Sequence, residues 1–224
     1  MNTYILIVVL IVVIISNNLL LQKKIENFPF DYDNLPEYDI EQNDIGETIG
    51  VQDQCASAFG GLVHIQADKE GIKPKRFLVR KEYQSYIESS LLMGFTGRQR
   101  FSSVASKKVN NALKSDKYLK KLEELHEISQ KGIDAFGKEA DIQENAKLTK
   151  ECRDIKLSIN DDKYDPVLME LIEESERAGS LCTRIMGAGG GGFFVCWAPE
   201  YKHEEIKNKI NVKTWVKVKI SATG

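Results

Sequence analysis

The glycine run from Gly187 to Gly192, in which five of six residues are glycine, restricts the fold more than any other stretch. It lies between Cys182–Met186 and Phe193–Trp197, whose apolar composition predicts strands. The run matches the spacing G-x-G-x-x-G, but a dinucleotide-binding loop must be followed by a helix, and here a strand is predicted to follow. The run also lacks the Gly-Lys-Ser/Thr of a P-loop. We therefore predict a turn between two strands. A hairpin pressed against a neighbouring element explains two or three glycines, and the surplus favours a turn that faces a ligand.

The rest of the chain alternates between helical and strand patterns. The clearest helix covers 166–178, because Asp165 can cap it, Pro166 suits its first position and Gly179 suits its end. Further helices are predicted over 52–59, 83–91, 102–113, 118–128, 143–155 and 200–210, further strands over 62–67, 77–79, 91–95 and 215–220, and a loop over 71–76. Strands separated by several helices predict an α+β fold with an antiparallel sheet.

Charge and cysteine content exclude several classes of protein. The 224 residues contain 31 Lys and Arg against 33 Asp and Glu, so the chain lacks the basic surplus of a nucleic-acid-binding protein. Its four cysteines are scattered without a CxxC pair, which argues against a disulfide framework and a zinc site. We expect reduced thiols in a cytoplasmic protein without a nucleic acid partner.

The first 22 residues carry no charged side chain. Residues 4–22 are nearly long and apolar enough to span a membrane, although Ser16, Asn17 and Asn18 interrupt the run. If they span it, Lys23 and Lys24 favour a cytoplasmic location for the remaining chain. A membrane anchor through 4–22 is therefore one interpretation. The others are a buried strand, given the many Val and Ile residues, or a stretch that stands where an ordinary domain start is missing.

A second dense segment surrounds Asp53. It reads GETIGVQDQCASAFGG over residues 46–61 and is rich in small residues, which indicates close packing. At the start of a helix the helix dipole stabilises an aspartate as carboxylate, and a positioned carboxylate can orient a hydroxyl group or take its proton during phosphoryl transfer. The alternative is that Asp53 only caps the helix.

Three motifs, taken in order, resemble the GHMP kinases. Residues 46–61 resemble the family's Gly-x-x-Asp-Gln segment, and RIMGAGGGGFFV, residues 184–195, resembles its C-terminal glycine motif. Between them, LLMGFTGRQRFSS, residues 91–103, resembles the Thr-Gly-x-x-Arg stretch of the heptose-phosphate kinase and fucokinase branch. The resemblance covers roughly residues 37–224. It implies an incomplete GHMP N-terminal domain followed by the family's C-terminal α/β sandwich, a ferredoxin-like antiparallel sheet with helices.

The resemblance also implies a function. Members transfer the γ-phosphate of ATP, with Mg²⁺, to a small-molecule hydroxyl, which in this branch is the anomeric hydroxyl of a sugar or sugar phosphate. Asp53 matches the catalytic aspartate, Glu41 a magnesium-binding glutamate, and Arg100 the arginine of the Thr-Gly-x-x-Arg stretch. The residues that match substrate or nucleotide-binding positions are Gln54, Gly187, Gly189, Gly190 and Gly191.

The family's ATP loop, of Gly-Leu-Gly-Ser-Ser-Ser-Ala type, has no counterpart in this sequence. We therefore predict three parts: a hydrophobic segment over 1–24, a remnant of the GHMP N-terminal domain over 25–75, and the C-terminal domain over 76–224. The chain resembles a sugar kinase without the N-terminal part that carries the ATP loop. It is then either a truncated product or half of a split enzyme whose partner chain supplies that part. The alternative is a non-catalytic GHMP-like binding protein, anchored to a membrane or not.

Overall fold

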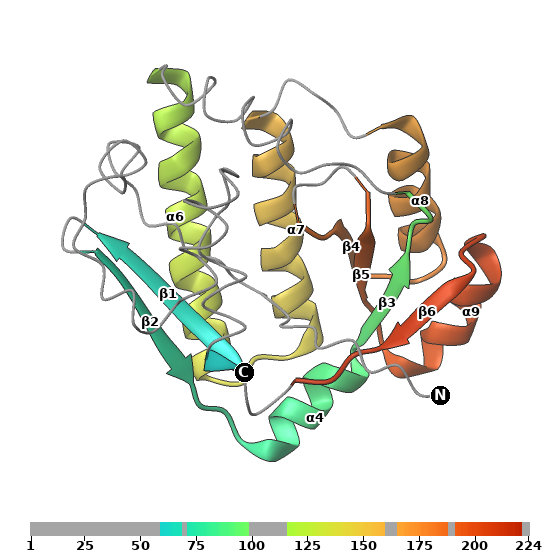
Figure 1. Ribbon diagram of the computed structural model, residues 1–224, viewed down its shortest axis with the longest axis horizontal. Coiled ribbons are helices and arrows are strands. Elements are labelled where there is room, and N and C mark those ends of the chain that lie inside the picture. Colours follow the sequence, from blue (N-terminus) through green and yellow to red (C-terminus); the bar gives the residue numbers. More distant parts are fainter. Residues whose placement is uncertain (1–58, 69–70, 99–115, 160–164, 188–190, 221–224) are drawn as a thin grey trace, which may run out of the picture.

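The computed structural model describes residues 59–68, 71–98, 116–159, 165–187 and 191–220. These residues form a four-stranded sheet, a two-stranded hairpin and helices that cover them (Figure 1). The strands are β1 Leu62–Asp68, β2 Gly71–Phe77, β3 Leu91–Phe95, β4 Cys182–Ile185, β5 Phe193–Trp197 and β6 Thr214–Lys217. The helices are α4 Lys81–Ser89, α6 Asp116–Gly137, α7 Ile142–Ile159, α8 Pro166–Arg177, the short 3₁₀ helix Glu200–Lys202 and α9 His203–Lys209.

The four-stranded sheet has the order β4-β5-β3-β6, and every neighbouring pair is antiparallel. The chain leaves β3 through helices to reach β4, turns directly into β5, and returns through α9 to β6. This is the β-α-β-β-α-β connection of ferredoxin-like domains. The predicted α+β class, with an antiparallel ferredoxin-like sheet, is confirmed.

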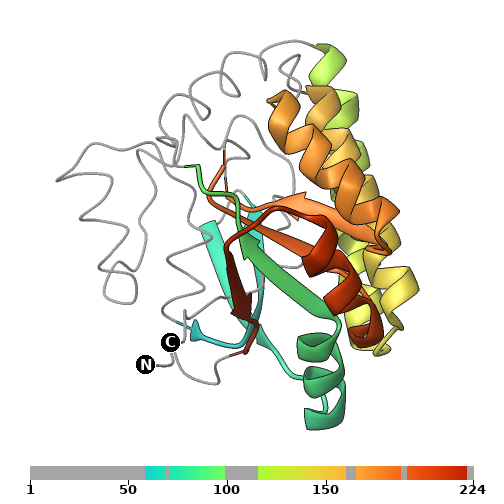
Figure 2. The same cartoon turned by 90° about the vertical axis from the view of Figure 1, so that its right-hand side faces the viewer.

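Helices cover both faces of this sheet. Because side chains alternate along a strand, β5 sends Phe194 and Cys196 into one buried cluster and Val195 and Trp197 into another. The first cluster contains apolar residues of α8 and α9, and the second contains residues of α4, α6 and α7. In Figure 1, α6 and α7 lie to the left of β4 and β5, and α8 and α9 lie to the right; in Figure 2, α8 and α9 lie in front of α6 and α7.

The β1–β2 hairpin packs against α6. The Phe77 ring meets the Phe136 ring edge to face at a centroid distance of 6.5 Å. Leu62 is buried in the same cluster as Phe136. The prediction of a loop over 71–76 is wrong, since these residues form β2. Its sequence GIKPKRF lacks an apolar alternation, and pairing with β1 holds it extended instead. The three-part division at residues 24 and 75 stays a prediction.

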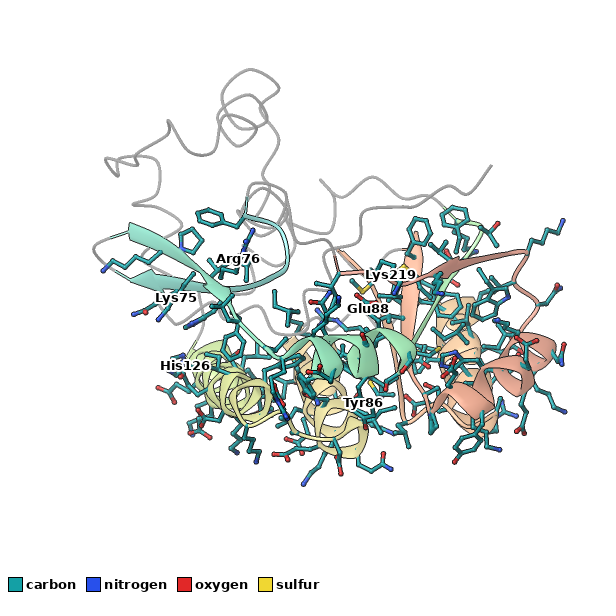
Figure 3. All side chains as sticks on the ribbon, turned by 90° about the horizontal axis from the view of Figure 1, so that it is seen from below. Lys75, Arg76, Tyr86, Glu88, His126 and Lys219 are labelled. Carbon is teal, nitrogen blue, oxygen red and sulfur yellow. The ribbon has the colours of Figure 1, made fainter. Side chains whose placement is uncertain are left out.

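Polar contacts fix the ends of α4, α7 and α8. The predicted helix over 166–178 is confirmed as α8, where the Asp165 carboxylate accepts a hydrogen bond from the Val167 amide at 2.9 Å. At the start of α7, the Ile142 amide donates to the Tyr86 hydroxyl at 2.9 Å. Glu88 of α4 accepts from the Ile220 amide and from Lys219, which lies beside it in Figure 3. The helices predicted over 52–59 and 102–113 lie outside the described residues except for Phe59.

A buried polar network joins α7, α8 and β4. Arg153 of α7 donates to the Thr183 carbonyl of β4 at 2.7 Å and forms an ion pair with Glu176 of α8. Glu176 also accepts from Lys150 at 2.8 Å and from the Thr183 amide at 3.2 Å. Burial alone raises the pKa of the Glu176 carboxyl, but the hydrogen bonds from Lys150 and Arg153 outweigh it and hold the pKa below its usual value.

Candidate functional site

The glycine turn lies at the end of the sheet where β4 finishes and β5 begins. Gly187 is exposed and has the left-handed φ of +63°, and the Met186 amide donates to the Phe193 carbonyl at 2.8 Å, which closes the hairpin. Gly191 has a φ of +139°, a conformation that residues with a side chain rarely adopt. The turn between two strands is confirmed. Ala188, Gly189 and Gly190 lie outside the described residues.

The segment that follows β3 docks onto this turn. The Thr96 amide donates to the Gly192 carbonyl at 2.8 Å, and the Gly192 amide donates to the Arg98 carbonyl at 2.8 Å. A Cβ atom on Gly191 would lie 3.0 Å from the Arg98 carbonyl oxygen. The structure thus joins the Thr-Gly-x-x-Arg stretch to the glycine motif through backbone contacts. Packing against Arg98 explains why Gly191 carries no side chain.

Gly187 differs from Gly191 in this respect. A Cβ atom placed on it would meet nothing within 4 Å. Its backbone therefore faces open space among the described residues, and only its left-handed φ favours glycine. Of the two described glycines that match the family's binding positions, Gly187 is the one whose surroundings leave room for a ligand.

An ion pair links the same end of the sheet to α8. Arg98 Nη1 lies 2.6 Å from Asp165 Oδ2, and Asp165 is also the residue that caps α8. The pair is half exposed, so its contribution to stability is small, but it ties the segment after β3 to the start of α8. Sequence reasoning found the cap and missed the pair, because nothing local indicates that Arg98 comes close to Asp165.

Two cations, Lys156 of α7 and Arg184 of β4, lie close to each other. Both side chains are half buried. The positive charge of Arg184, and secondly burial, lowers the pKa of Lys156 to about 8. Lys156 gave no signal in the sequence, since a lysine on a polar helix ordinarily faces solvent.

Two of the described cysteines, Cys182 and Cys196, are poorly suited to act as nucleophiles. Cys152, Cys182 and Cys196 are free thiols. Burial raises the pKa of Cys182 to about 12 and that of Cys196 to about 11, so both remain protonated at neutral pH. Cys55 lies outside the described residues.

Several predicted site residues lie outside the described residues: Glu41, Asp53, Gln54, Arg100, Gly189 and Gly190. Within the described part of the chain, no group of three or more His, Cys, Asp or Glu side chains is arranged to hold a metal ion. No helix in this part is long and apolar enough to cross a bilayer, and residues 4–22 lie outside it. The catalytic and magnesium assignments therefore stay predictions.

A comparison with known families finds a match in the part of the chain that contains the glycine turn. Residues 121–217 match the family described as GHMP kinases C terminal. This part of the chain is similar to the C-terminal domain of the GHMP kinases. The resemblance predicted from three motifs is thereby confirmed over these residues, and GHMP kinases are phosphotransferases.

Relatives of the GHMP domain include more than one kind of kinase. A mevalonate kinase of Thermococcus onnurineus (strain NA1) is 28% identical over 183 residues, which are 75% of this chain and 47% of that protein. The solved L. major mevalonate kinase in complex with R-mevalonate matches with a TM-score of 0.59 at 16% identity, covering 75% of this chain and 53% of the other. A D-glycero-D-manno-heptose 1-phosphate kinase from Bacteriodes thetaiotaomicron matches with a TM-score of 0.57 at 19% identity, covering 80% and 49%.

These matches have two consequences. The likeness to the solved structures shows the fold alone, and it includes both sugar and mevalonate kinases, so it does not single out a sugar as the acceptor. The chain also spans about half the length of the relatives it matches.

Proposed function

We propose that this chain contributes the C-terminal part of an ATP-dependent kinase that phosphorylates a hydroxyl group of a small molecule. The observation that carries the proposal is the glycine turn, where Gly187 has an open, left-handed backbone and Gly191 and Gly192 contact Arg98. Two of the motifs that resemble the GHMP kinases meet there, at one end of a sheet with the family's fold. In the same turn, no atom lies within 4 Å of a Cβ placed on Gly187, which leaves room for a ligand there.

Our first choice of acceptor is a sugar or sugar phosphate, at its anomeric hydroxyl. It is supported by the Thr-Gly-x-x-Arg stretch, which resembles the heptose-phosphate kinase branch, and by the fold shared with a heptose 1-phosphate kinase. The second candidate is mevalonate, because the relative from T. onnurineus is a mevalonate kinase.

Phosphoryl transfer depends mainly on positioning and electrostatics. The described residues fit the phosphates of a nucleotide better than a metal, because they offer an open left-handed backbone at Gly187 but no cluster of acidic groups. We assign Gln54, Gly187, Gly189, Gly190 and Gly191 to substrate or nucleotide binding. We assign Glu41 to the magnesium ion and Asp53 to orienting the acceptor hydroxyl and taking its proton. Bound Mg·ATP supplies the phosphoryl group.

The test is an acceptor panel with the full chain, Mg²⁺ and ATP: heptose 7-phosphate, fucose, galactose and mevalonate. ADP release measures turnover, and ³¹P NMR identifies the product. We expect Asp53→Asn to lower turnover at least about 100-fold without changing the melting temperature, since a positioned base contributes about 10²–10⁴-fold. Asp134→Asn, an exposed carboxylate on α6, is the matched control and should leave turnover unchanged. A folded chain that, together with any co-purifying partner, binds no ATP and turns over no acceptor contradicts the proposal and favours the non-catalytic binding protein.

A cytoplasmic location, with an anchor through residues 4–22 as the alternative, is also a proposal. Fractionation of cells tests it, since an anchored chain sediments with membranes and resists extraction by high salt. The same sample tests the proposed partner chain: a partner that supplies the missing N-terminal part should co-purify with the chain and add ATP turnover.

A further inference from the structure

Lys156 of α7 and Arg184 of β4 each lie just beyond the point where these two neighbouring elements are joined by a hydrogen bond. On α7, Arg153 donates to the Thr183 carbonyl of β4 at 2.7 Å. One helical turn further along α7 comes Lys156, and one residue further along β4 comes Arg184. Both elements thus advance together toward the glycine turn, which Gly187 opens three residues after Arg184 (Figure 1).

Strand alternation places Arg184 on the α7 face of β4. Thr183 points to the opposite face, where its hydroxyl contacts the Ser175 hydroxyl of α8 at 2.7 Å. Cys182 lies in the cluster shared with α4, α6 and α7, and Arg184 follows it with the same orientation. Arg184 therefore points to the same side of the sheet as α7, the helix that carries Lys156.

The two cations lack a counter-charge within the described part of the chain. Glu176, the acid between α7 and α8, is already shared by Lys150 and Arg153. The groups that act electrostatically on Lys156 are Arg184 and Cys152, one turn earlier on α7, and no carboxylate is among them. Holding two like charges together in a half-buried place is unfavourable, and an anion bound between them removes the penalty.

We propose that Lys156 and Arg184 form a binding subsite for an oxyanion, a carboxylate or phosphate group carried by the acceptor substrate. This inference rests on the proposed function and narrows it, because it makes the acceptor an anionic alcohol such as a sugar phosphate or a hydroxy acid. An arginine can bind two oxygens of such a group at once, and an ammonium adds a compact charge. The location, beside the strand that leads into the glycine turn, puts the anion next to the proposed phosphate-binding backbone.

Chemical labelling of Lys156 tests the subsite in the full chain. With a pKa of about 8, half of its side chains are neutral and reactive at pH 8, against about 0.4% for an ordinary lysine. We expect inorganic phosphate to slow acylation of Lys156 by an N-hydroxysuccinimide ester at least fivefold, as mapped by mass spectrometry, relative to sodium chloride at equal ionic strength. Lys147, an exposed lysine on the same helix, serves as internal control and should label at the same rate in both salts.

Two variants separate the subsite from general effects. Arg184→Gln removes the neighbouring charge, so basal labelling of Lys156 should fall severalfold and phosphate should no longer protect it, while circular dichroism shows the fold retained. Lys147→Met should leave both the rate and the protection at Lys156 unchanged. Equal labelling of Lys156 in phosphate and chloride overturns the proposal, as does full phosphate protection in Arg184→Gln.

The source of the anion is tested with three further ligands, each without the others. Slower labelling of Lys156 in mevalonate or heptose 7-phosphate supports an acceptor site. Slower labelling in ATP but in neither acceptor contradicts it. ADP release is measured separately. Phosphate protection in a chain that never turns over ATP contradicts only the proposed function. Turnover of galactose or fucose without phosphate protection contradicts only the subsite.

Discussion

Replacing Glu176 by glutamine tests the network that holds α7, α8 and β4 together. Glutamine keeps the size of the side chain but removes the charge that faces Arg153, whose side chain is only 7% exposed. Breaking one partner of a buried pair costs about 3–5 kcal/mol. Glu176 is 21% exposed and Lys150 is half exposed, so screening reduces the loss, and we expect about 2–3 kcal/mol.

For a chain of this size that loss corresponds to a fall in melting temperature of about 5–10 °C. Urea unfolding followed by circular dichroism measures it, with Glu173→Gln on the exposed face of α8 as the control that should change stability by less than about 0.5 kcal/mol. Arg153→Met combined with Glu176→Gln should cost clearly less than the sum of the two single changes. Strict additivity, or a Glu176→Gln chain as stable as the control, would refute the assignment of this pair as a coupled buried contact.

Further predictions concern the same elements. Folding lowers the pKa of Glu176, so its contribution to the free energy of unfolding is present above about pH 4.5 and is lost as the pH falls through the lower pKa of the folded chain. The stability difference between the parent chain and Glu176→Gln should therefore narrow in acid, which urea titrations at several pH values measure. Gly191→Ala should lower the free energy of unfolding by about 1–3 kcal/mol, because its φ is +139° and the new Cβ meets the Arg98 carbonyl. Gly187→Ala, with open space around it, should cost only about 1 kcal/mol in the same assay yet weaken ATP binding in calorimetry. Gly94→Ala should cost about 1–3 kcal/mol, since its Cβ would lie 2.5 Å from the buried Phe194 ring.

Local signals explain which parts of the fold could be predicted. Helix α8 has its cap, its proline and its terminal glycine within the segment itself, and its bounds agree with the prediction to one residue. β5 is an apolar run beside a glycine turn and was equally clear. β2 carries no such signal. It contains Pro74 and three basic residues, and only its pairing with β1 makes it a strand.

The candidate site shows the same limit more strongly. The glycine turn was predictable because strands flank it, but its partner was not, since the Gly192–Arg98 contact joins residues that are far apart in sequence. The pairing of Arg98 with Asp165 and the closeness of Lys156 to Arg184 also arise from how helices cross strands. No periodicity within one segment contains that information.

The sheet order explains why these particular segments form the site. β5 lies between β4 and β3, so the turn that opens β5 must lie beside the exit of β3. Thr96 and Arg98, which follow Phe95, therefore meet the glycine turn, and Gly191 is needed there to let Arg98 approach. That requirement is structural and would exist in a protein without ligands. Ligand binding is therefore best tested at the features that packing leaves unexplained. These are the open backbone at Gly187 and the uncompensated charges of two residues, Arg184 on β4 and Lys156 on α7. If the chain is a kinase, substitutions at these positions should change ligand binding more than stability, whereas at Glu176 the order should be reversed.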